Sequence, residues 1–573
     1  MKTELTDSRR LTGANLYWDR PSAILDVRIS SSPMPVIRAW ESAAERWLDT
    51  AGYADEKTCF RVFEGGASLL ISAPIDVLYS MCELNELAWA SALATCDKGE
   101  APDPEEEIPR LTRLFDEERN PALLALQAAA LEHDVPFLWD DDDVSLGYGK
   151  TARVWKPDDL PLPEELDWSL FSTVPVALVT GTNGKSTTVR MTASIMTAAG
   201  YNAGLTSTDF IRVGERVIDR GDYSGTGGAR MLMRQPDVEM AVLEVARGGL
   251  LRRGLGVGHA DVAVVTNVAA DHLGEYGINS VPELIPVKLI VRRALDRNAP
   301  LVLNADDEGL AEYAGKLDQR ITWFSLDPKN PYLKRSLDQG GTVCYLEEGW
   351  LTAAEGNSRR PVAPVREIPA ARDGIVRYNL RNALAAMCVA IALGIDDAAI
   401  RKGLADFRGD EHDNPGRGNW FEHRVDGGLV RILVDFAHNE HGMKALSEAV
   451  SQVPAERVLL LIGQAGDRSD QDIIALLEAG CHTLPDQLLV AELPGYERGR
   501  EPFEVPELIS REALRLGIPA GAIEIFPTPR DATASALSRA RPGDLLILLA
   551  LTQRSEALSL VHEFMESGDS NHG

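Results

Sequence analysis

The sequence predicts an α/β protein with a parallel-sheet central unit, a Rossmann-like C-terminal unit and an α+β N-terminal unit. The strongest sign is an apolar run at 174–179, followed by a glycine-containing turn at 181–184 and a helical pattern at 185–199. From there, apolar segments alternate with helical segments, which is typical of a parallel sheet covered by helices on both faces. A chain of 573 residues has room for three or four domains at about 150 residues each. The expected units are 1–165, 170–410 and 411–573.

Composition narrows the class of protein. The net charge of −29 argues against a nucleic-acid partner, because phosphates would be repelled. This charge has two explanations, solubility (or a salt-adapted host) and a cationic substrate. No segment has the roughly 20 apolar residues of a membrane span, and the first residues do not resemble a signal peptide. The six cysteines have no metal or redox spacing, so we expect a cytoplasmic protein with reduced thiols.

Patterning places the elements of each unit. The N-terminal unit has strand patterns at 23–29 and 67–71 and a helical pattern at 36–51, and prolines 157, 161 and 163 indicate a linker after it. Further strands of the central unit are expected at 240–245, 262–266 and 301–303. Strands of the C-terminal unit are expected near 432–436, 458–462, 488–492, 523–526 and 545–549.

The turn at 181–187 is typical of a phosphate cradle. Backbone N–H groups and the helix N-terminus would face the phosphates, Lys185 would reach the outer ones and Ser186 would bind magnesium. The spacing is not that of the standard P-loop, because Val179 stands where the first glycine of that pattern would be. The alternative is a chance glycine turn before a core helix.

Polar side chains follow two strands of the same predicted sheet. Glu244 ends one strand, and Asn267, Asp271 and His272 follow another. Ligands of open parallel sheets bind at the carboxyl ends of the strands. A carboxylate and an imidazole beside a phosphate loop predict a magnesium site. Taken singly, Glu244 is also compatible with a surface acid and His272 with a loop histidine.

An ordered set of short motifs resembles the Mur ligase family, and within it the C-terminal half of the cyanophycin synthetases. The set covers roughly 170–573 and is more specific than any one motif; residues 11–18 also resemble the opening of the synthetases' N-terminal domain. The matching stretches lie at 181–186, 204–209, 229–231, 243–249, 266–273, 304–307, 382–386, 414–417, 435–439, 466–468 and 498–500.

The resemblance implies ATP-dependent amide-bond formation through an acyl phosphate. Lys185 would neutralise the transferring phosphoryl group, and Ser186, Glu244 and His272 would bind magnesium. Lys288 stands where Mur ligases often carry a carbamylated lysine that holds a second magnesium ion. Its alternative is a solvated helix lysine. The catalytic residues implied are therefore Lys185, His272 and Lys288, and the cofactors are ATP and two Mg²⁺ ions.

The resemblance also implies where the nucleotide lies. Asn379 and Asn382 would contact the adenine, Arg417 the phosphates as the C-terminal unit closes, and Asp435 the ribose, although a plain strand-end turn is the alternative for Asp435. The ATP-binding residues implied are Thr182, Asn183, Gly184, Lys185, Ser186, Thr187, Asn379, Asn382, Arg417 and Asp435.

Selection of the amine would belong to the C-terminal unit. If the amine is arginine, Glu492 or Asp467 could pair with its guanidinium group, and nearby arginines could hold a carboxylate. Each candidate is also compatible with an ordinary surface charge. The candidates are Asp467, Arg468, Glu492, Arg498 and Arg500.

The chain departs from cyanophycin synthetases because only a short linker stands where they carry an ATP-grasp domain. One ATP site and one bond-forming activity are therefore expected. The sequence favours a ligase that joins an amino acid, such as arginine, to a carboxylate of an acidic peptide or cyanophycin-like polymer, with the N-terminal unit holding the acceptor or supporting assembly. The alternatives are a non-catalytic, polymer-binding or regulatory partner of a complete synthetase and a ligase with a small-molecule acceptor. Homo-oligomerisation and a partner synthetase both remain open.

Overall fold

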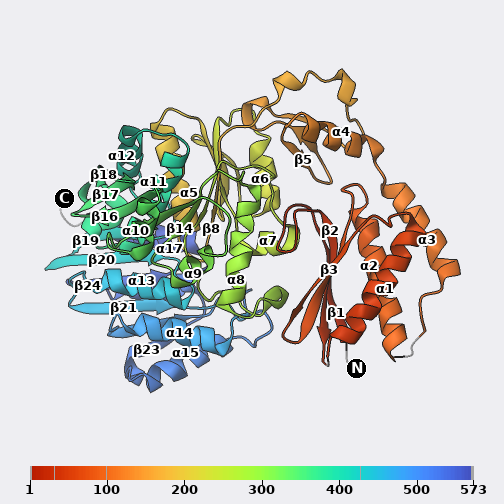
Figure 1. Ribbon diagram of the computed structural model, residues 1–573. Coiled ribbons are helices and arrows are strands. Elements are labelled where there is room, and N and C mark those ends of the chain that lie inside the picture. The colour runs from red at the N-terminus through yellow and green to blue at the C-terminus, as the bar shows by residue number, and fades with distance from the viewer. Residues whose placement is uncertain (1–2, 31, 98–99, 426, 570–573) are drawn as a thin grey trace.

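The computed structural model describes residues 3–30, 32–97, 100–425 and 427–569, and within these residues the strands form four sheets. We call the part that contains β1–β7 the N-terminal unit, the part with β8–β18 the central unit and the part with β19–β24 the C-terminal unit. Figure 1 shows the central unit between the other two. None of the helices in the described ranges combines the length and apolar character of a membrane span.

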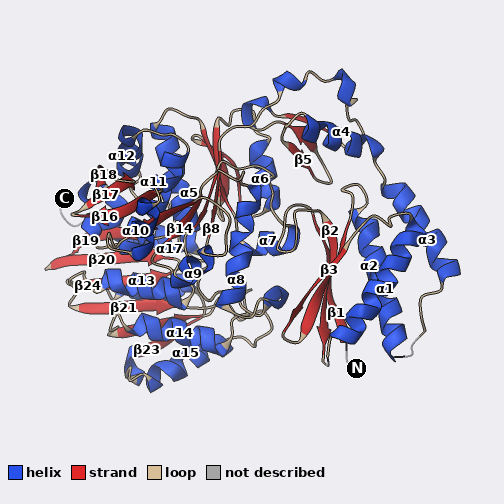
Figure 2. Ribbon diagram, viewed as in Figure 1, coloured by secondary structure: helices blue, strands red, loops and turns tan. Residues whose placement is uncertain are grey.

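The N-terminal unit packs helices against one antiparallel sheet of order β1-β2-β4-β3 (Figure 2). Helix α1 turns one apolar stripe inward, including Trp40 and Trp47, whose indole N–H groups donate to Asn85 and Ser91. A smaller sheet, β5-β6-β7, precedes the linker. The elements are β1 (Thr3–Leu11), β2 (Ser22–Ile29), α1 (Met34–Ala51), β3 (Thr58–Phe63), β4 (Gly66–Ser72), α2 (Leu78–Asp97), α3 (Pro104–Glu118), α4 (Pro121–Glu132), β5 (Phe137–Trp139), β6 (Val144–Leu146) and β7 (Arg153–Trp155).

The central unit is one eleven-stranded sheet of order β11-β10-β9-β12-β8-β13-β14-β15-β16-β17-β18. Its middle strands are parallel, with β8 between β12 and β13. The strands are β8 (Val176–Thr180), β9 (Ala203–Thr206), β10 (Phe210–Val213), β11 (Arg216–Arg220), β12 (Met240–Glu244), β13 (Val262–Val265), β14 (Leu301–Asn304), β15 (Ile321–Ser325), β16 (Thr342–Glu347), β17 (Trp350–Glu355) and β18 (Ser358–Pro364).

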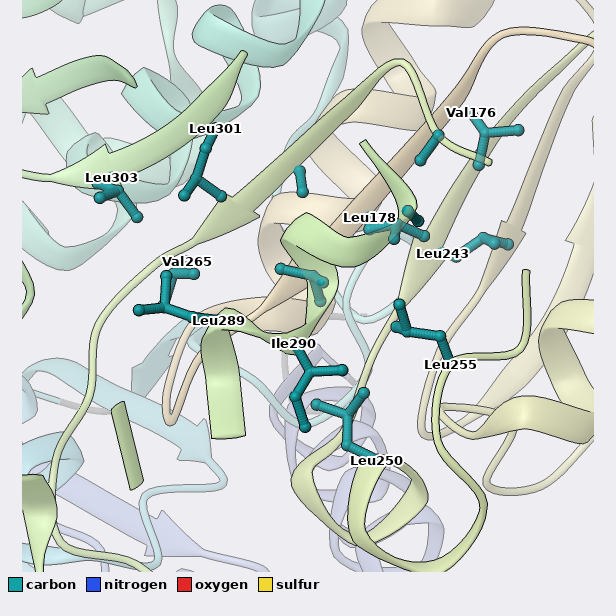
Figure 3. Close-up of a cluster of buried hydrophobic side chains, with 14 of the residues drawn as sticks. Val176, Leu178, Leu243, Leu250, Leu255, Val265, Leu289, Ile290, Leu301 and Leu303 are labelled. Carbon is teal, nitrogen blue, oxygen red and sulfur yellow. The ribbon is translucent and has the colours of Figure 1, made fainter. Parts of the chain in front are cut away.

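Helices cover both faces of this sheet. On one face, strand side chains of β8, β12, β13 and β14 meet residues of α7 and of the segment after α8, and Figure 3 shows Leu178 and Leu243 in this cluster near Leu250 and Leu255. Helices α5, α11 and α12 cover the other face. The helices are α5 (Lys185–Ala198), α6 (Thr226–Met233), α7 (Arg247–Arg253), α8 (Val281–Lys288), α9 (Glu308–Ala314), α10 (Pro331–Asp338), α11 (Arg377–Ala392) and α12 (Asp397–Asp406).

Both edges of the central sheet are antiparallel, which the expectation of a parallel sheet did not include. Strands β10, β11, β17 and β18 each pair antiparallel with a neighbour. Two-residue turns at 214–215, 348–349 and 356–357 join successive strands, and each contains a glycine with positive φ. Turns this short join antiparallel neighbours, whereas a parallel pair needs a long crossover.

The C-terminal unit is a six-stranded sheet of order β19-β20-β24-β21-β22-β23, parallel except at β19. The strands are β19 (Asn419–Val425), β20 (Gly428–Asp435), β21 (Arg457–Ile462), β22 (Gln487–Ala491), β23 (Ile523–Phe526) and β24 (Asp544–Leu549). The helices are α13 (Glu440–Val450), α14 (Asp470–Cys481), α15 (Glu504–Arg515), α16 (Pro529–Ser538) and α17 (Arg554–Asp569).

The N-terminal unit contacts the central unit through its first strand. The backbone after β1 pairs with the end of α7, where the N–H of Thr12 donates to the carbonyl of Arg253 at 2.7 Å and that of Leu255 donates to Ala14 at 2.8 Å. Gly13 is required here, because a Cβ at this position would lie 2.2 Å from the carbonyl oxygen of Leu255. This close approach sets the N-terminal sheet beside α7 (Figure 1).

Candidate active site

A cavity of about 1150 Å³ lies where the strand ends of the central unit face the C-terminal unit. Its wall includes the turn at 182–187, the residues that follow β12, β13 and β14, the start of α11, and the segment from the end of β20 into α13. The carboxyl ends of the central parallel strands therefore open into it, as expected for a ligand site in this kind of sheet.

The turn after β8 is shaped for phosphate. Gly181 (φ 146°) and Gly184 (φ 83°) have backbone conformations that favour glycine, and a Cβ at Gly184 would lie 2.3 Å from Oδ1 of Asn382. Helix α5 begins at Lys185 without a side-chain cap, so its first N–H groups are left for a ligand. Lys185 donates a hydrogen bond from Nζ to the carbonyl oxygen of Thr182 at 2.9 Å.

A buried carboxylate stands beside this turn. Glu244, at the end of β12, is 2% exposed; its Oε2 accepts from the backbone of Thr208 at 3.3 Å, and its Oε1 has no hydrogen-bond partner among the residues that the structure describes. Ser186 Oγ lies 3.3 Å from Thr208 Oγ1, so Thr208 connects the two predicted ligands. A buried carboxylate oxygen without a partner is costly unless a cation or donor binds it. The donor set therefore fits a divalent cation.

His272 lies on a separate loop of the cavity wall. Its Nδ1 is 3.5 Å from Glu275 Oε1 and its Nε2 is 2.9 Å from Arg468 of the C-terminal unit. The hydrogen bond with His272, helped by Arg247, lowers the pKa of Glu275 to about 2. His272, Glu275 and Asp467 also form a possible three-ligand group, and Glu244 is not part of it.

Asp271 is more central than the sequence indicated. It forms an ion pair with Arg468 at 2.9 Å and lies 3.7 Å from Nε2 of His438. Burial opposes its ionisation, but the His438 hydrogen bond and the Arg468 charge lower the pKa of Asp271 well below its ordinary value. Asp271 therefore joins the central unit to the C-terminal unit across the cavity.

The turn at 181–187, which we call the P-loop from here on, also contacts the C-terminal unit directly. The side-chain amides of Asn183 and Asn439 exchange two hydrogen bonds of 3.0 and 3.1 Å, and Asn183 lies 3.0 Å from Nδ1 of His441. Arg417 donates from Nη2 to Oγ1 of Thr208 at 3.0 Å, and its guanidinium carbon lies 4.7 Å from the centre of the Phe436 ring. The two units are thus in contact around the predicted phosphate site.

Lys288 is buried and does not face bulk solvent, unlike the solvated helix lysine of the alternative. It is 3% exposed and donates to the carbonyl oxygen of Gly181 at 2.9 Å. Burial and the charge of Lys185 lower the pKa of Lys288 well below its ordinary value. A lowered pKa favours the uncharged amine, which is the form that reacts with carbon dioxide.

The residues predicted to hold the nucleoside line the same cavity. Asn379 donates to the carbonyl of Ala370 at 2.8 Å and accepts from Asn382 at 3.1 Å, which fixes both amides against the P-loop. Asp435 ends β20, and burial raises its pKa to about 6 although the backbone N–H of Ala437 donates to it at 2.8 Å.

The five amine-selecting candidates separate into two groups. Asp467 and Arg498 line the cavity and pair with each other. Glu492 lies outside the lining, since its carboxylate accepts the backbone N–H groups of Leu493 and Phe503. Arg500 and Arg468 also lie outside it. Arg500 donates to the carbonyl oxygens of Gly466 and Arg468 and so holds the loop at 466–468.

Basic residues of α7 also line the cavity and were not singled out from the sequence. Arg247, Arg252 and Arg253 stand there opposite the glycine-rich start of α6 at 225–228. Arg247 falls within the motif at 243–249, whereas Arg252 and Arg253 lie beyond it and carry no signal in the sequence. They make this part of the cavity basic in a chain of net charge −29.

Comparison with known proteins shows which family the chain belongs to. Residues 179–390 match the family model described as "Mur ligase middle domain", and residues 416–550 match "Mur ligase, glutamate ligase domain". The chain belongs to the Mur ligase family. Mur ligases are ATP-dependent ligases, and the cavity lies between the two matched regions.

The relatives of this chain include long synthetases. Cyanophycin synthetase of Synechocystis sp. is 35% identical over 390 residues, which cover 68% of this chain and 44% of that protein. UDP-N-acetylmuramoyl-L-alanyl-D-glutamate–2,6-diaminopimelate ligase of Geobacter metallireducens is 27% identical over 401 residues, covering 65% of this chain and 73% of that ligase. The chain thus spans less than half the length of the synthetases that it matches.

Solved structures also align with part of this chain. Escherichia coli FolC in complex with DHPP and ADP aligns with 70% of this chain and 89% of its own, at 21% identity and a TM-score of 0.49. MurF from Acinetobacter baumannii aligns with 69% of this chain and 77% of its own, at 19% identity and a TM-score of 0.47.

Proposed function

We propose that the chain joins an amino acid to a carboxylate of an acidic peptide or cyanophycin-like polymer, with ATP as the energy source. The observation that supports this most is the buried Oε1 of Glu244, which has no partner within the described residues. It stands beside the uncapped start of α5, in a cavity lined by the central and C-terminal units. An anion cradle next to a cation ligand is what a magnesium–nucleotide complex requires.

The proposed reaction has two steps. An acceptor carboxylate attacks the γ-phosphorus of ATP, which releases ADP and leaves an acyl phosphate. The amine then attacks the acyl carbon, loses a proton, and expels inorganic phosphate from a tetrahedral intermediate. Lys185 and the first N–H groups of α5 would stabilise charge on the transferring phosphoryl group.

Magnesium fits two sets of residues in this proposal. Ser186, Glu244 and His272 would hold one ion, and a carbamate on Lys288 would help to hold a second. When bound, the metal would neutralise phosphate charge and orient the γ-phosphoryl group. Asn379, Asn382, Arg417 and Asp435 would hold the nucleoside and outer phosphates, since all four line the cavity.

The basic part of the cavity favours an acidic acceptor. Arg247, Arg252 and Arg253 carry guanidinium groups, which bind carboxylates in pairs of hydrogen bonds. Arg247 already holds Glu275 and Arg252 donates to the Tyr276 hydroxyl, so an acceptor carboxylate would bind at Arg253 and at the remaining N–H groups of the other two. Asp467 offers a carboxylate on the C-terminal unit that suits a cationic amine such as arginine, which would replace or join Arg498 as its partner. Glu492 is less suited to that role because backbone N–H groups occupy both of its oxygens.

A phosphate-release screen tests this function. The twenty amino acids are each combined with ATP, magnesium and one of three classes of acceptor: aspartate-rich peptides, cyanophycin primers or small-molecule carboxylates. We expect phosphate release that needs both amine and acceptor, and mass spectrometry should show the new amide. Absence of amine-dependent release with every acceptor would favour a non-catalytic partner of a complete synthetase, and release only with small acceptors would favour a small-molecule ligase.

Lys185→Ala should abolish this release, because it removes the charge nearest the transferring phosphoryl group. The matched control is Lys402→Ala, an exposed lysine that pairs with Asp406 on α12. A Lys185→Ala variant with the turnover of the control would exclude chemistry at this P-loop.

A further inference from the structure

The loop at 272–277 has a backbone that needs outside support. His272 (φ 51°), Gly274 (φ 93°), Tyr276 (φ 53°) and Gly277 (φ 65°) are all left-handed. Left-handed backbone costs a residue with a side chain about 1–2 kcal/mol and persists where neighbours hold it in place. Within the loop, the N–H of Gly274 donates to the carbonyl of Ile278 at 2.8 Å, and that of Ile278 donates to Glu275 at 3.1 Å.

The N-terminal sheet supplies part of that support. Arg61 on β3 donates from Nη2 to the carbonyl oxygens of Tyr276 at 2.9 Å and Gly277 at 3.0 Å. Phe63, two residues further on, fills the space beside Gly277, where a Cβ would lie 2.3 Å from Phe63 Cδ1. The β3–β4 hairpin therefore fits a backbone that only glycine provides at position 277.

A second strand of the same sheet contacts the loop from another direction. The guanidinium of Arg9 on β1 lies 4.7 Å from the centre of the Tyr276 ring, and Asp26 fixes Arg9 through a 2.5 Å ion pair. On the side of the central unit, Arg252 donates to the Tyr276 hydroxyl at 2.8 Å. Tyr276 is thus held by its ring, its hydroxyl and its carbonyl group.

These contacts extend to the cavity wall. Arg247 holds Glu275 through the carboxylate at 2.7 Å and the carbonyl at 2.9 Å, and Glu275 lies 3.5 Å from His272. A change in the backbone at 276–277 would therefore move the two side chains that this loop presents to the cavity.

We propose that the N-terminal unit sets the conformation of the 272–277 loop, with Arg61 as a positioning residue for His272 and Glu275. The catalytic consequence depends on the ligase function proposed above, whereas the order of the loop does not. This role differs from holding an acceptor chain, because it predicts an effect on the loop in the absence of any acceptor.

Hydrogen exchange in the full chain tests the proposal without substrates. Arg61→Ala removes two hydrogen bonds, so exchange at the Gly274 and Ile278 amides should rise by about tenfold while exchange in α5 stays unchanged. The control is Arg119→Ala, an exposed arginine of the same unit that pairs with Asp116. Unchanged exchange at 274 and 278, or an equal rise in α5, would overturn the proposal.

A paired substitution gives a second readout. Gly277→Ala should also raise exchange in the loop, because its methyl group meets Phe63, and Phe63→Ala added to it should restore part of the protection. Failure of Phe63→Ala to restore any protection would contradict the assigned contact.

Turnover then connects the loop to the proposed reaction. If the wild-type chain is a ligase, Arg61→Ala should lower kcat by about tenfold to a hundredfold and leave KM for ATP within about twofold. An unchanged kcat alongside raised loop exchange would remove the catalytic part of the proposal. A wild-type chain without ligase activity would refute the proposed function alone, since the exchange experiment still decides the role of Arg61.

Discussion

At the scale of single residues, burial gives Asp435 an unusual titration. Its pKa is raised from 3.8 to about 6, so between these values the folded chain binds a proton that the unfolded chain does not. The stability that this group contributes is complete below about pH 4 and is lost as pH rises through about 6.

Asp435→Asn should therefore change the pH dependence of stability. The thermal midpoint of the variant relative to wild type should rise between pH 4 and pH 7, because the variant does not lose the bound proton. Thermal unfolding measured across this range checks the sign. Asp318→Asn, an exposed carboxylate, serves as the control, and a constant offset between Asp435→Asn and wild type would contradict the expectation.

Two glycines at the ends of α5 distinguish the effect of a steric clash from the effect of positive φ alone. Gly184→Ala should weaken ADP binding by at least about a hundredfold, because its Cβ would lie 2.3 Å from Asn382 Oδ1 and would distort the cradle. Gly200→Ala is the control, because Gly200 also has positive φ but no atom lies within 4 Å of its Cβ position. Calorimetric titration with ADP decides, and equal affinities in the two variants would refute the steric argument.

At the scale of elements, Asp209 joins four segments of the chain. It pairs with Arg190 of α5, with Arg417 of the 414–418 segment at 3.7 Å and with Arg554 at the start of α17 at 3.0 Å. Arg190 is 1% exposed and also donates to Asn414. A single carboxylate thus balances three guanidinium groups between the central and C-terminal units.

Asp209→Asn should destabilise the chain by about 3–5 kcal/mol, because it leaves these cations without their counter-charge. Asp116→Asn, which removes an exposed partner of Arg119, should cost at most about 1 kcal/mol. Urea unfolding of both variants measures the difference. A similar decrease in the free energy of unfolding in the two variants would mean that water screens the charges of Asp209 and its three arginine partners.

Much of this architecture could be predicted because its signals are local. Periodicity located β12, β13 and β21 within one or two residues, and Gly184 with Lys185 located the turn between β8 and α5. The antiparallel edges were missed because their evidence lies in two-residue turns such as 348–349. Glu492 follows β22 as predicted, yet its oxygens bind backbone, which no strand-end rule foresees. The Arg61 contact joins residues 215 positions apart, beyond the reach of any local pattern.

At the scale of the whole molecule, the N-terminal and central units share backbone hydrogen bonds. Thr12 pairs with Arg253 and Ala14 with Leu255, while Gly13 passes between them without a side chain. Such a junction predicts that the N-terminal unit unfolds together with the central unit.

Gly13→Ala should separate these transitions, because its methyl group would lie 2.2 Å from the carbonyl oxygen of Leu255. Scanning calorimetry should then show an N-terminal transition at lower temperature. Gly521→Ala, where no atom lies within 4 Å of the Cβ position, should leave the profile unchanged. A single unfolding transition in Gly13→Ala would contradict this, because it would mean that the backbone at the junction adjusts to the methyl group and the two units still unfold together.

The close packing of Phe63 against Gly277 also has a consequence for recombination between genes that encode such chains. A crossover in the proline-containing segment at 157–163 would separate the two residues and join each to a partner from another lineage. The hybrid would keep an intact phosphate cradle but inherit a hairpin shaped for a different loop. Descent should therefore transmit Arg61, Phe63 and Gly277 as one unit, although more than two hundred residues separate the first from the last.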